Sequence, residues 1–161
     1  MKAIFAGTFD PFTLGHKNIV ERAAKLFDGV IIAVADDTGK NTAPLSVRTE
    51  IAKVAVADIA NATVESFCGL LSDYVAEKGD CVLVRGVRNG NDLEYERDLT
   101  AVYKSLCGVE SIILITDSAY GHVSSTVVRT VAVLGGDIDG YVVPSTAKQI
   151  TQVYGKNTIG G

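Results

Sequence analysis

The sequence has no tryptophan, and its aromatic residues make up only 7% of the chain. The hydrophobic interior must therefore be built from aliphatic side chains, and valine, isoleucine, leucine and alanine are all frequent. The net charge is −4, and no run of lysine and arginine marks a basic stripe. This argues against extended contact with the phosphate backbone of a nucleic acid. Recognition of phosphate is therefore expected to be local and to use a few placed groups.

Cysteines and long apolar runs are also scarce. Cys68, Cys81 and Cys107 are odd in number and lack metal-binding spacing, so we expect free thiols in a reducing compartment, with Cys81 as a small buried residue. The longest apolar run, from Val30 to Ala35, is too short to cross a bilayer. The apolar start of the chain is too short for a signal peptide. The sequence therefore predicts a soluble, cytoplasmic protein without a membrane partner.

The length of 161 residues suits one domain, which we expect to span residues 1–161 with a mobile tail at 156–161. Short apolar runs alternate with segments in which apolar residues recur at helical spacing, and no internal repeat is present. This alternation predicts a Rossmann-like α/β fold, a doubly wound parallel sheet of about five strands with helices on both faces. The expected strands are 2–6, 30–35, 62–66, 81–84 and 111–115, and the expected helices are 15–27, 46–60, 70–78, 92–106, 124–134 and 145–154.

Polar residues gather where these strands are expected to end. Residues 8–16 follow the first strand, 36–40 the second, 85–88 the fourth and 118–126 the fifth. In doubly wound sheets, ligands bind beyond the carboxyl ends of the strands, near a switch in strand order. These four segments are therefore the expected walls of a ligand site.

The most informative segment runs from Gly7 to His16 and reads Gly-Thr-Phe-Asp-Pro-Phe-Thr-Leu-Gly-His. Gly7 allows a tight exit from the strand, and His16 falls in the first turn of the next helix. An imidazole at a helix N-terminus is well placed to meet an anion, because the free N–H groups and the helix dipole favour one. A lone histidine is more often a surface residue, but the ordered turn before His16 favours a functional role.

Two further segments carry groups suited to phosphate. Arg85 and Arg88 lie three residues apart with a glycine between them, and each guanidinium can hold phosphate oxygens in a bidentate manner. The hydroxyl residues 124–126 open a helix, and Arg129 follows one turn later on the same face. A helix start of this composition is expected to hold an anion.

The remaining polar segments have simpler explanations. Asp92 is expected to be the N-cap of the helix that it begins. Asp36 and Asp37 lack a third carboxylate at ligand spacing, so solvation of a loop explains them and no protein metal site is predicted. Lys40 does not belong to a Walker loop, because Val34 stands where the first glycine would be. No Gly-x-Gly-x-x-Gly follows the first strand, which argues against a dinucleotide-binding redox protein.

These motifs, in this order, resemble those of a known family. Thr13-Leu14-Gly15-His16 is similar to the HxGH signature of the adenylyl- and cytidylyltransferases, a nucleotidyltransferase superfamily. The opening Gly-Thr-Phe-Asp-Pro and the later Arg-Gly-Val-Arg resemble the bacterial phosphopantetheine adenylyltransferase family in particular, over roughly residues 2–144. The resemblance implies an enzyme of coenzyme A biosynthesis. It would transfer the adenylyl group of ATP to 4'-phosphopantetheine by direct in-line attack, giving dephospho-coenzyme A and pyrophosphate with no covalent enzyme intermediate.

The resemblance also implies roles for individual residues. His16 would stabilise charge on the α-phosphoryl group in the transition state, with Lys40 and Arg88 as further catalytic cations. The expected ATP contacts are Thr8, Phe9, His16, Gly86, Val87, Arg88, Glu96, Tyr120, Val123, Ser124, Ser125 and Thr126. The expected contacts with 4'-phosphopantetheine are Thr8, Lys40, Leu71 and Arg85.

The family also implies Mg²⁺ bound with ATP, held largely by phosphates and water, and assembly as a homohexamer. The sequence departs from the family pattern on the acceptor side. Tyr103 stands where the family usually has asparagine, and Thr130 where glutamate is common. His122 is interpreted as a nucleotide-side or surface residue rather than a second catalytic histidine.

Two other functions stay open. An adenylyl- or cytidylyltransferase of the same superfamily would use another acceptor, such as nicotinamide mononucleotide, or CTP with glycerol phosphate. Lys40, Arg85 and the Gly-Thr-Phe-Asp-Pro opening argue against it. A non-catalytic nucleotide-binding regulator is the other alternative, and binding of ATP without release of pyrophosphate would favour it.

Overall fold

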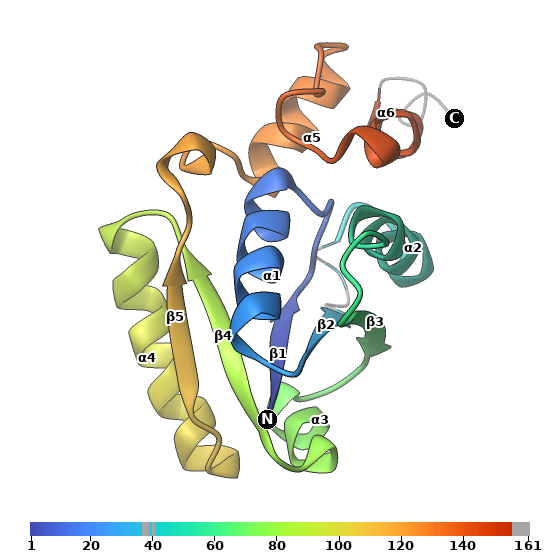
Figure 1. The fold of residues 1–161 in the computed structure, drawn as a ribbon. Coiled ribbons are helices and arrows are strands. Elements are labelled where there is room, and N and C mark those ends of the chain that lie inside the picture. The colour runs from blue at the N-terminus through green and yellow to red at the C-terminus, as the bar shows by residue number, and fades with distance from the viewer. Residues whose placement is uncertain (37–38, 40, 156–161) are drawn as a thin grey trace.

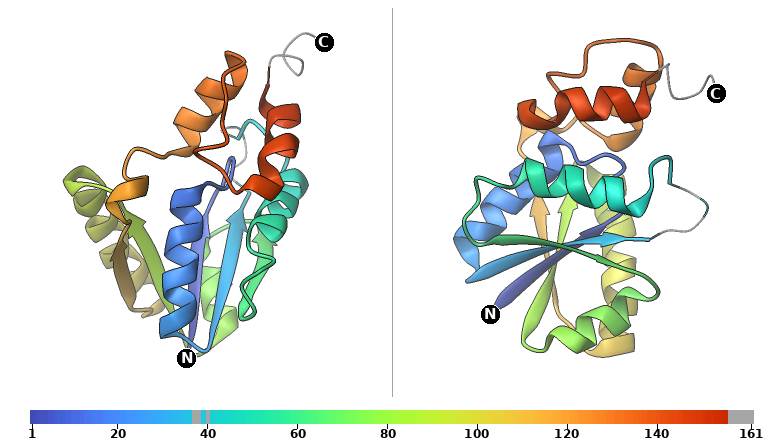
Figure 2. Two further views of the ribbon diagram at one scale, coloured as in Figure 1. Left: turned by 45° about the horizontal axis from the view of Figure 1, so that its top comes forward. Right: turned by 90° about the vertical axis from the view of Figure 1, so that its right-hand side faces the viewer.

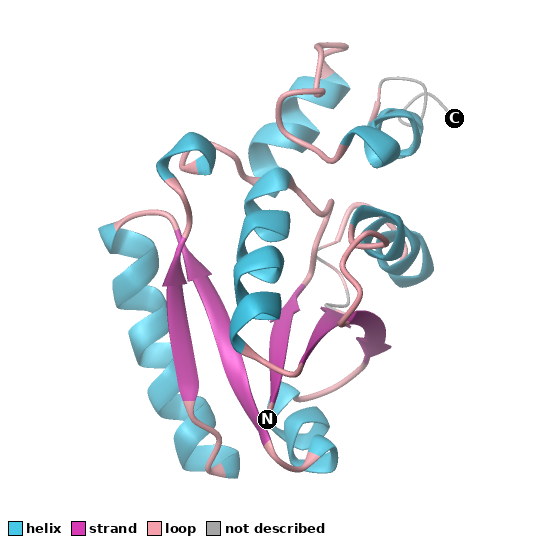
Figure 3. Ribbon diagram, in the orientation of Figure 1, coloured by secondary structure: helices cyan, strands magenta, loops and turns pink. Residues whose placement is uncertain are grey.

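The computed structural model describes residues 1–36, 39 and 41–155. In this part of the chain, five strands form one parallel sheet in the order β3-β2-β1-β4-β5 (Figures 1 and 3). The predicted fold class is confirmed. Lys40, Asp37 and the tail 156–161, all named in predictions from the sequence, lie outside the described residues.

The elements alternate along the chain as expected. The strands are β1 (Lys2–Gly7), β2 (Gly29–Ala35), β3 (Ala62–Phe67), β4 (Cys81–Val87) and β5 (Ser111–Ile115). The helices are α1 (Leu14–Leu26), α2 (Leu45–Ala55), α3 (Leu71–Lys78), α4 (Gly90–Cys107), α5 (Ser125–Val133) and α6 (Ala147–Tyr154), with 3₁₀ turns at Ser118–Tyr120 and Pro144–Thr146.

The sheet separates two apolar layers of unequal size. Alternate residues of β1, β2 and β4 pack on one face against α1 and α2, and this layer continues to α5 and α6. The opposite residues of the same strands pack against α3 and α4 in a smaller layer, which includes the half-buried Cys81. Figure 2 shows these helices on the two sides of the sheet, with α5 and α6 beyond the carboxyl ends of the strands. All three cysteines are free thiols.

Most element boundaries differ from the predictions by one or two residues, and three differences have a clear physical cause. The second helix ends at Ala55 rather than at residue 60, because the chain then closes a tight turn in which Ile59 N–H donates to Val56 O at 2.9 Å. Strand β4 continues to Val87 because its last residues pair with β5. The N-cap of α4 is Asn89 and not Asp92, since Asn89 Oδ1 accepts the Asp92 N–H at 3.0 Å.

The strand order creates a crevice at the carboxyl end of the sheet. From β1 the chain winds outward through β2 and β3, and then returns to the other side of β1 for β4 and β5. The connections therefore diverge at the carboxyl ends of β1 and β4, which is where ligands bind in folds of this kind.

A fully buried arginine holds this end of the sheet together. Arg48 of α2 is only 1% exposed, and its Nε–H donates to Ala43 O at 3.0 Å. Its Nη1 group donates to Thr8 O and, at 2.9 Å, to Ala35 O. One guanidinium thus joins the loop after β1, the end of β2 and the entry to α2.

Asp10 forms a second buried link in the loop after β1. Its carboxylate accepts the Thr42 N–H at 2.7 Å, the Ala43 N–H at 3.2 Å and the Tyr154 hydroxyl at 2.6 Å. Burial, and the hydrogen bond to Asp10, raise the pKa of Tyr154. The last helix is thereby fixed to the loop that follows the first strand.

None of the helices in the described part of the chain combines the length and the hydrophobicity needed to cross a bilayer.

Replacing Arg48 with methionine is expected to lower the free energy of unfolding by roughly 2–5 kcal/mol, because the carbonyls of Thr8, Ala35 and Ala43 lose their buried donor. Urea unfolding at neutral pH measures the change. The control is Arg97→Met, since Arg97 is an exposed residue that pairs with Asp98, and it should shift stability by less than about 0.5 kcal/mol. Equal effects of the two substitutions would contradict the structural role of Arg48.

Candidate active site

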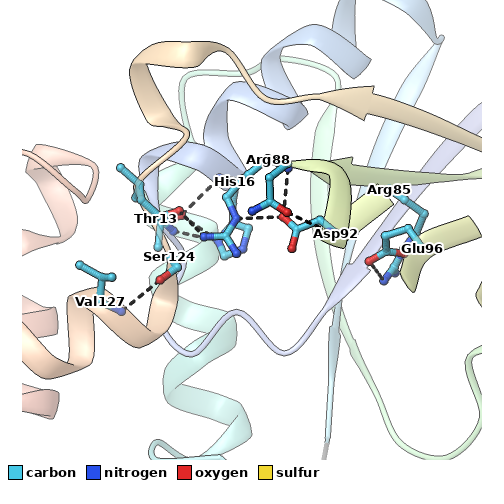
Figure 4. Close-up of polar contacts among 10 residues, drawn as sticks. Thr13, His16, Arg85, Arg88, Asp92, Glu96, Ser124 and Val127 are labelled. Atoms are coloured by element: carbon cyan, nitrogen blue, oxygen red, sulfur yellow. Dashed lines mark hydrogen bonds and ion pairs between the residues drawn. The ribbon is translucent and has the colours of Figure 1, made fainter. Parts of the chain in front are cut away.

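A cavity of about 410 Å³ lies at the carboxyl ends of β1 and β4. Its walls come from the loop after β1, the start of α1, the end of β4 and the first turns of α4 and α5 (Figure 4). All five segments follow or end strands β1, β4 and β5, so the cavity occupies the crevice created by the strand order.

His16 is held in the cavity wall by the N-cap of α1. Thr13 N–H donates to His16 Nδ1 at 3.0 Å, and His16 N–H donates to Thr13 Oγ1 at 3.3 Å, which forms a reciprocal capping box. Because Nδ1 is an acceptor in this arrangement, the neutral ring carries its proton on Nε2. The ring therefore offers an N–H donor to a ligand in the cavity.

Three phenylalanines surround the same imidazole. Phe9 meets the His16 ring edge-on with centroids 4.9 Å apart, and the centroids of Phe12 and Phe5 lie 5.3 and 6.1 Å from it. Burial in this apolar setting, reinforced by the nearby positive charge of Arg88, lowers the pKa of His16 to about 4. The ring is therefore neutral at physiological pH and in this state can donate a hydrogen bond from Nε2.

The start of α5 forms the opposite wall. Ser124 is the N-cap, with its hydroxyl accepting the Val127 N–H at 3.1 Å, and the Ser125 hydroxyl donates to Pro11 O at 2.7 Å. Arg129, expected on the same face as these hydroxyls, donates to Asp10 O at 2.6 Å and to the Thr126 hydroxyl at 3.3 Å, and it is not part of the cavity wall. A helix start of this kind can bind an anion at its free backbone N–H groups.

Gly86 is required at the end of β4 because of close packing. A Cβ atom built on it would lie 2.9 Å from Ile19 Cγ1 of α1, closer than real contacts allow. Because Gly86 has no Cβ atom, α1 can lie against β4 between Arg85 and Arg88. Arg85, which precedes it, is within the strand rather than after it.

A second cavity of about 400 Å³ adjoins the first. Both are lined by Ala6, Gly7, Thr8, Arg85 and Tyr95, so the two spaces meet at the end of β1. Beyond this junction, the wall of the second cavity includes Leu70, Leu71, Leu99, Tyr103 and Leu106. The site thus has two compartments of similar volume with a polar junction.

Most of the residues predicted as ligand contacts line one of these spaces. Val87 does not, because it is buried at the strand end, and Tyr120 is absent from both walls. Leu71 lies in the second cavity with Tyr103, and Lys40 lies outside the described residues. The predicted residues that line the first cavity are Thr8, Phe9, His16, Arg85, Gly86, Arg88, Glu96, Val123, Ser124, Ser125 and Thr126.

Sequence reasoning missed the second function of Asp92. Its carboxylate lines the first cavity and accepts from both the backbone N–H and the Nε–H of Arg88, at 3.0 and 3.2 Å. The available signal was the i, i+4 spacing between Arg88 and Asp92, which places the two side chains one turn apart.

Comparisons with known proteins agree with this arrangement. A model of the cytidylyltransferase-like family matches residues 4–131. A phosphopantetheine adenylyltransferase of Acidovorax sp. (strain JS42) is 43% identical over 96% of this chain and 94% of its own length. A phosphopantetheine adenylyltransferase of Corynebacterium glutamicum (strain R) is 40% identical over 96% of this chain and 98% of its own. The chain belongs to the phosphopantetheine adenylyltransferase family, within the cytidylyltransferase-like group.

A solved structure supports the fold independently. A Vibrio parahaemolyticus protein assigned as a nicotinate-nucleotide adenylyltransferase superposes with a TM-score of 0.70, covering 94% of this chain and 91% of its own. At 20% identity, this likeness concerns the fold alone.

The low pKa of His16 should make stability depend on pH. Its pKa is about 4 in the folded chain against about 6.5 when unfolded, so the stabilisation is complete above pH 6.5 and is lost as the pH falls towards 4. The reference variant is His16→Asn, whose Oδ1 can still accept the Thr13 N–H. Between pH 7 and 4.5 the parent protein should lose about 2 kcal/mol more than this variant in urea unfolding. Parallel pH curves for the two proteins would disprove the assignment.

Proposed function

We propose that the protein transfers the adenylyl group of ATP to 4'-phosphopantetheine, giving dephospho-coenzyme A and pyrophosphate. The observation that carries the proposal is the pair of adjoining cavities that meet at Thr8 and Arg85. One is lined by His16, Arg88 and a helix start, as suits a nucleotide triphosphate, and the wall of the other includes several leucines, as suits the pantetheine arm. Two relatives at 40–43% identity carry the name of this activity.

The reaction places an acceptor phosphate at the junction and the α-phosphorus of ATP beside His16. A phosphate oxygen of the acceptor attacks the α-phosphorus in line, and the bond to the β,γ-pyrophosphate breaks. Because the neutral His16 ring carries its proton on Nε2, it can donate this N–H to an α-phosphate oxygen, where charge grows in the transition state. Arg88 supplies a cation for the phosphates. No covalent bond to the protein forms, and catalysis consists of positioning and charge stabilisation.

The acceptor is held at both of its ends. Its phosphate meets Thr8 and Arg85 at the junction, and Lys40 is proposed as a further cation there from the family resemblance. The arm lies along Leu71, and Tyr103 occupies part of the same wall. Tyr103 therefore takes the place of the asparagine expected from the family without leaving the acceptor cavity.

Mg²⁺ is proposed to accompany ATP and to neutralise charge on its phosphates. Among the described residues, no cluster of three or more His, Cys, Asp or Glu side chains could hold a metal ion. The cavity residues fit a metal bound mainly through phosphate oxygens and water, because the two carboxylates in the wall of the first cavity, Asp92 and Glu96, are already paired with Arg88 and Arg85.

A cytoplasmic homohexamer is also proposed, from the family resemblance. Light scattering on the purified protein tests the assembly, and a mass near six chains of 17.0 kDa each is expected.

The reaction is tested by measuring pyrophosphate release from ATP and Mg²⁺ with 4'-phosphopantetheine as acceptor. Parallel assays contain nicotinamide mononucleotide, or CTP with glycerol 3-phosphate. Release with 4'-phosphopantetheine alone is the expected result. Release only with another acceptor would preserve the nucleotidyl transfer and reject the acceptor, and ATP binding without release in any assay would indicate a non-catalytic regulator.

Replacing His16 with asparagine should lower kcat by at least about 100-fold while changing the affinity for ATP by less than about threefold, since the lost hydrogen bond forms mainly in the transition state. Steady-state kinetics and calorimetric titration with ATP measure the two quantities. Equal losses in turnover and ATP affinity would assign His16 a binding role only.

A further inference from the structure

A buried threonine at the end of β5 lines the first cavity. Thr116 follows the strand directly and is only 8% exposed. Its backbone N–H donates to Val87 O at 2.8 Å, which extends the contact between β4 and β5 by one residue. Its side chain belongs to the wall of the first cavity. No role was predicted for this residue from the sequence.

The Thr116 hydroxyl has no hydrogen-bond partner within the described part of the chain. The other buried threonines there are satisfied. The Thr13 hydroxyl accepts the His16 N–H, and the Thr146 hydroxyl donates to Val143 O at 2.7 Å. A buried hydroxyl without a partner costs free energy, and native proteins keep few of them. An unpaired hydroxyl in a cavity wall therefore indicates that a ligand completes its hydrogen bonding.

The Thr116 side chain lies on the same side of the sheet as His16. Side chains alternate along a strand, so Thr116 shares the face of Leu114. Leu114 belongs to the larger apolar layer, on the α1 side of the sheet. It is paired with Gly86 of β4, which lines the first cavity together with His16. Thr116 therefore meets the cavity at the floor that the ends of β4 and β5 provide.

The residue after Thr116 is held by the helix that carries His16. Asn18 Nδ2 donates to Asp117 Oδ2 at 2.7 Å, and Asn18 Oδ1 accepts the Asp117 N–H at 3.1 Å. Asn18 is only 7% exposed, and this reciprocal pair uses both ends of its amide. Arg22 of the same helix adds a hydrogen bond to Asp117 Oδ1 at 3.3 Å. The end of β5 is thereby fixed to α1, which sets the position of Thr116 relative to His16.

The groups suited to phosphate lie elsewhere in this cavity. They are the His16 N–H, the Arg88 guanidinium and the free backbone N–H groups at the start of α5. Thr116 adds no charge, and its hydroxyl can both donate and accept a hydrogen bond. This suits the uncharged part of a nucleotide, whose sugar hydroxyls and base edge carry donors and acceptors.

We propose that the Thr116 hydroxyl binds the nucleoside part of ATP, and that Asn18 and Asp117 are positioning residues that hold it in place. The proposal rests on the proposed function for the presence of ATP in the first cavity. It adds to that function a contact for the nucleoside and a link between this contact and the helix of His16.

The first test is Thr116→Val, which keeps the side-chain shape and removes the hydroxyl. The KM for ATP should rise by about threefold to tenfold, with kcat and the KM for 4'-phosphopantetheine within about twofold, because the contact is made equally in the ground state and the transition state. The calorimetric dissociation constant for ATP should rise by the same factor. Thr116→Ser restores a hydroxyl and should recover most of the affinity that the valine variant loses.

Stability should change in the opposite direction to affinity. Because the hydroxyl has no partner in the described chain, Thr116→Val should leave the midpoint of urea unfolding unchanged or raise it. The matched control is Thr63→Val at an exposed position of β3, which should leave both KM values unchanged. A lower midpoint for Thr116→Val with an unchanged ATP affinity would make Thr116 a structural residue and overturn the proposal.

Tripolyphosphate separates a contact with the nucleoside from a contact with phosphate. In calorimetric titration, Thr116→Val should bind tripolyphosphate within about twofold of the parent protein, since this probe has no nucleoside. If the variant loses affinity for tripolyphosphate and for ATP by the same factor, the hydroxyl binds phosphate and the assignment to the nucleoside is wrong.

Exchanging the two side chains tests the positioning pair. Asn18→Asp sets two carboxylates against each other in place of the 2.7 Å hydrogen bond, and should raise the KM for ATP by at least about threefold. Adding Asp117→Asn restores the pair with its roles reversed and should bring the KM back to within about twofold of the parent value. Glu21→Gln, at an exposed position of the same helix, should have no effect.

A merely structural pair would give a different pattern. Asn18→Asp would then lower the unfolding midpoint without changing the KM for ATP. An exchanged variant as impaired in ATP binding as Asn18→Asp would also reject the positioning role. In a Thr116→Val background, Asn18→Asp should raise the KM for ATP by less than about twofold, because the group to be positioned is already absent, and full additivity would contradict this.

The outcomes also separate this proposal from the proposed reaction. If the parent protein binds ATP but releases no pyrophosphate, adenylyl transfer fails, and the calorimetric constants still decide the role of Thr116. If the parent protein is active and Thr116→Val binds ATP as the parent does, the reaction stands and the nucleoside contact is wrong.

Discussion

The buried guanidinium of Arg48 is the interaction on which the geometry of the site depends. The loop after β1 carries Thr8 and leads into the capping box of His16, and it is not part of the sheet. Arg48 holds the loop in place by donating to the carbonyl of Thr8, just after β1, and to the carbonyl of Ala35, at the end of β2. An arginine suits the position because one planar group can satisfy several carbonyls while its stem packs in the apolar core. The junction between the cavities is therefore fixed from inside the protein.

The electrostatic design of the cavity follows from this placement. Aromatic rings keep the imidazole of His16 neutral, and its N-cap partner sets which nitrogen carries the proton. Positive charge is supplied instead by Arg85 and Arg88, where the end of β4 and the start of α4 come together. A neutral donor beside cations of fixed orientation can stabilise charge that develops at phosphorus without needing to change its own protonation state.

Local sequence patterns were enough to predict the fold class, all five strands and the segments that surround the cavity, because apolar periodicity and strand-end chemistry are local. They could not predict that β4 extends to Val87, since this depends on pairing with β5. Arg48 gave no signal, because an arginine on an amphipathic helix normally faces water and only tertiary contacts show that it is buried. Arg129 lies on the predicted face of the helix, but its guanidinium donates to the backbone carbonyl of Asp10 and does not line the cavity. The ion pair between Glu96 and Arg85 also gave no signal, because the two residues lie eleven positions apart on different elements.

The neutral state of His16 has a consequence for how the chemistry responds to acidity. With a pKa of about 4, this ring does not change charge between mildly acidic and mildly basic conditions. A phosphate monoester, in contrast, gains a proton near pH 6, which weakens it as a nucleophile. An acidic limb near pH 6 in the rate of transfer is then expected to report the ionisation of the acceptor rather than that of His16. The histidine that marks this family in sequence does not, in this chain, sense pH near neutrality.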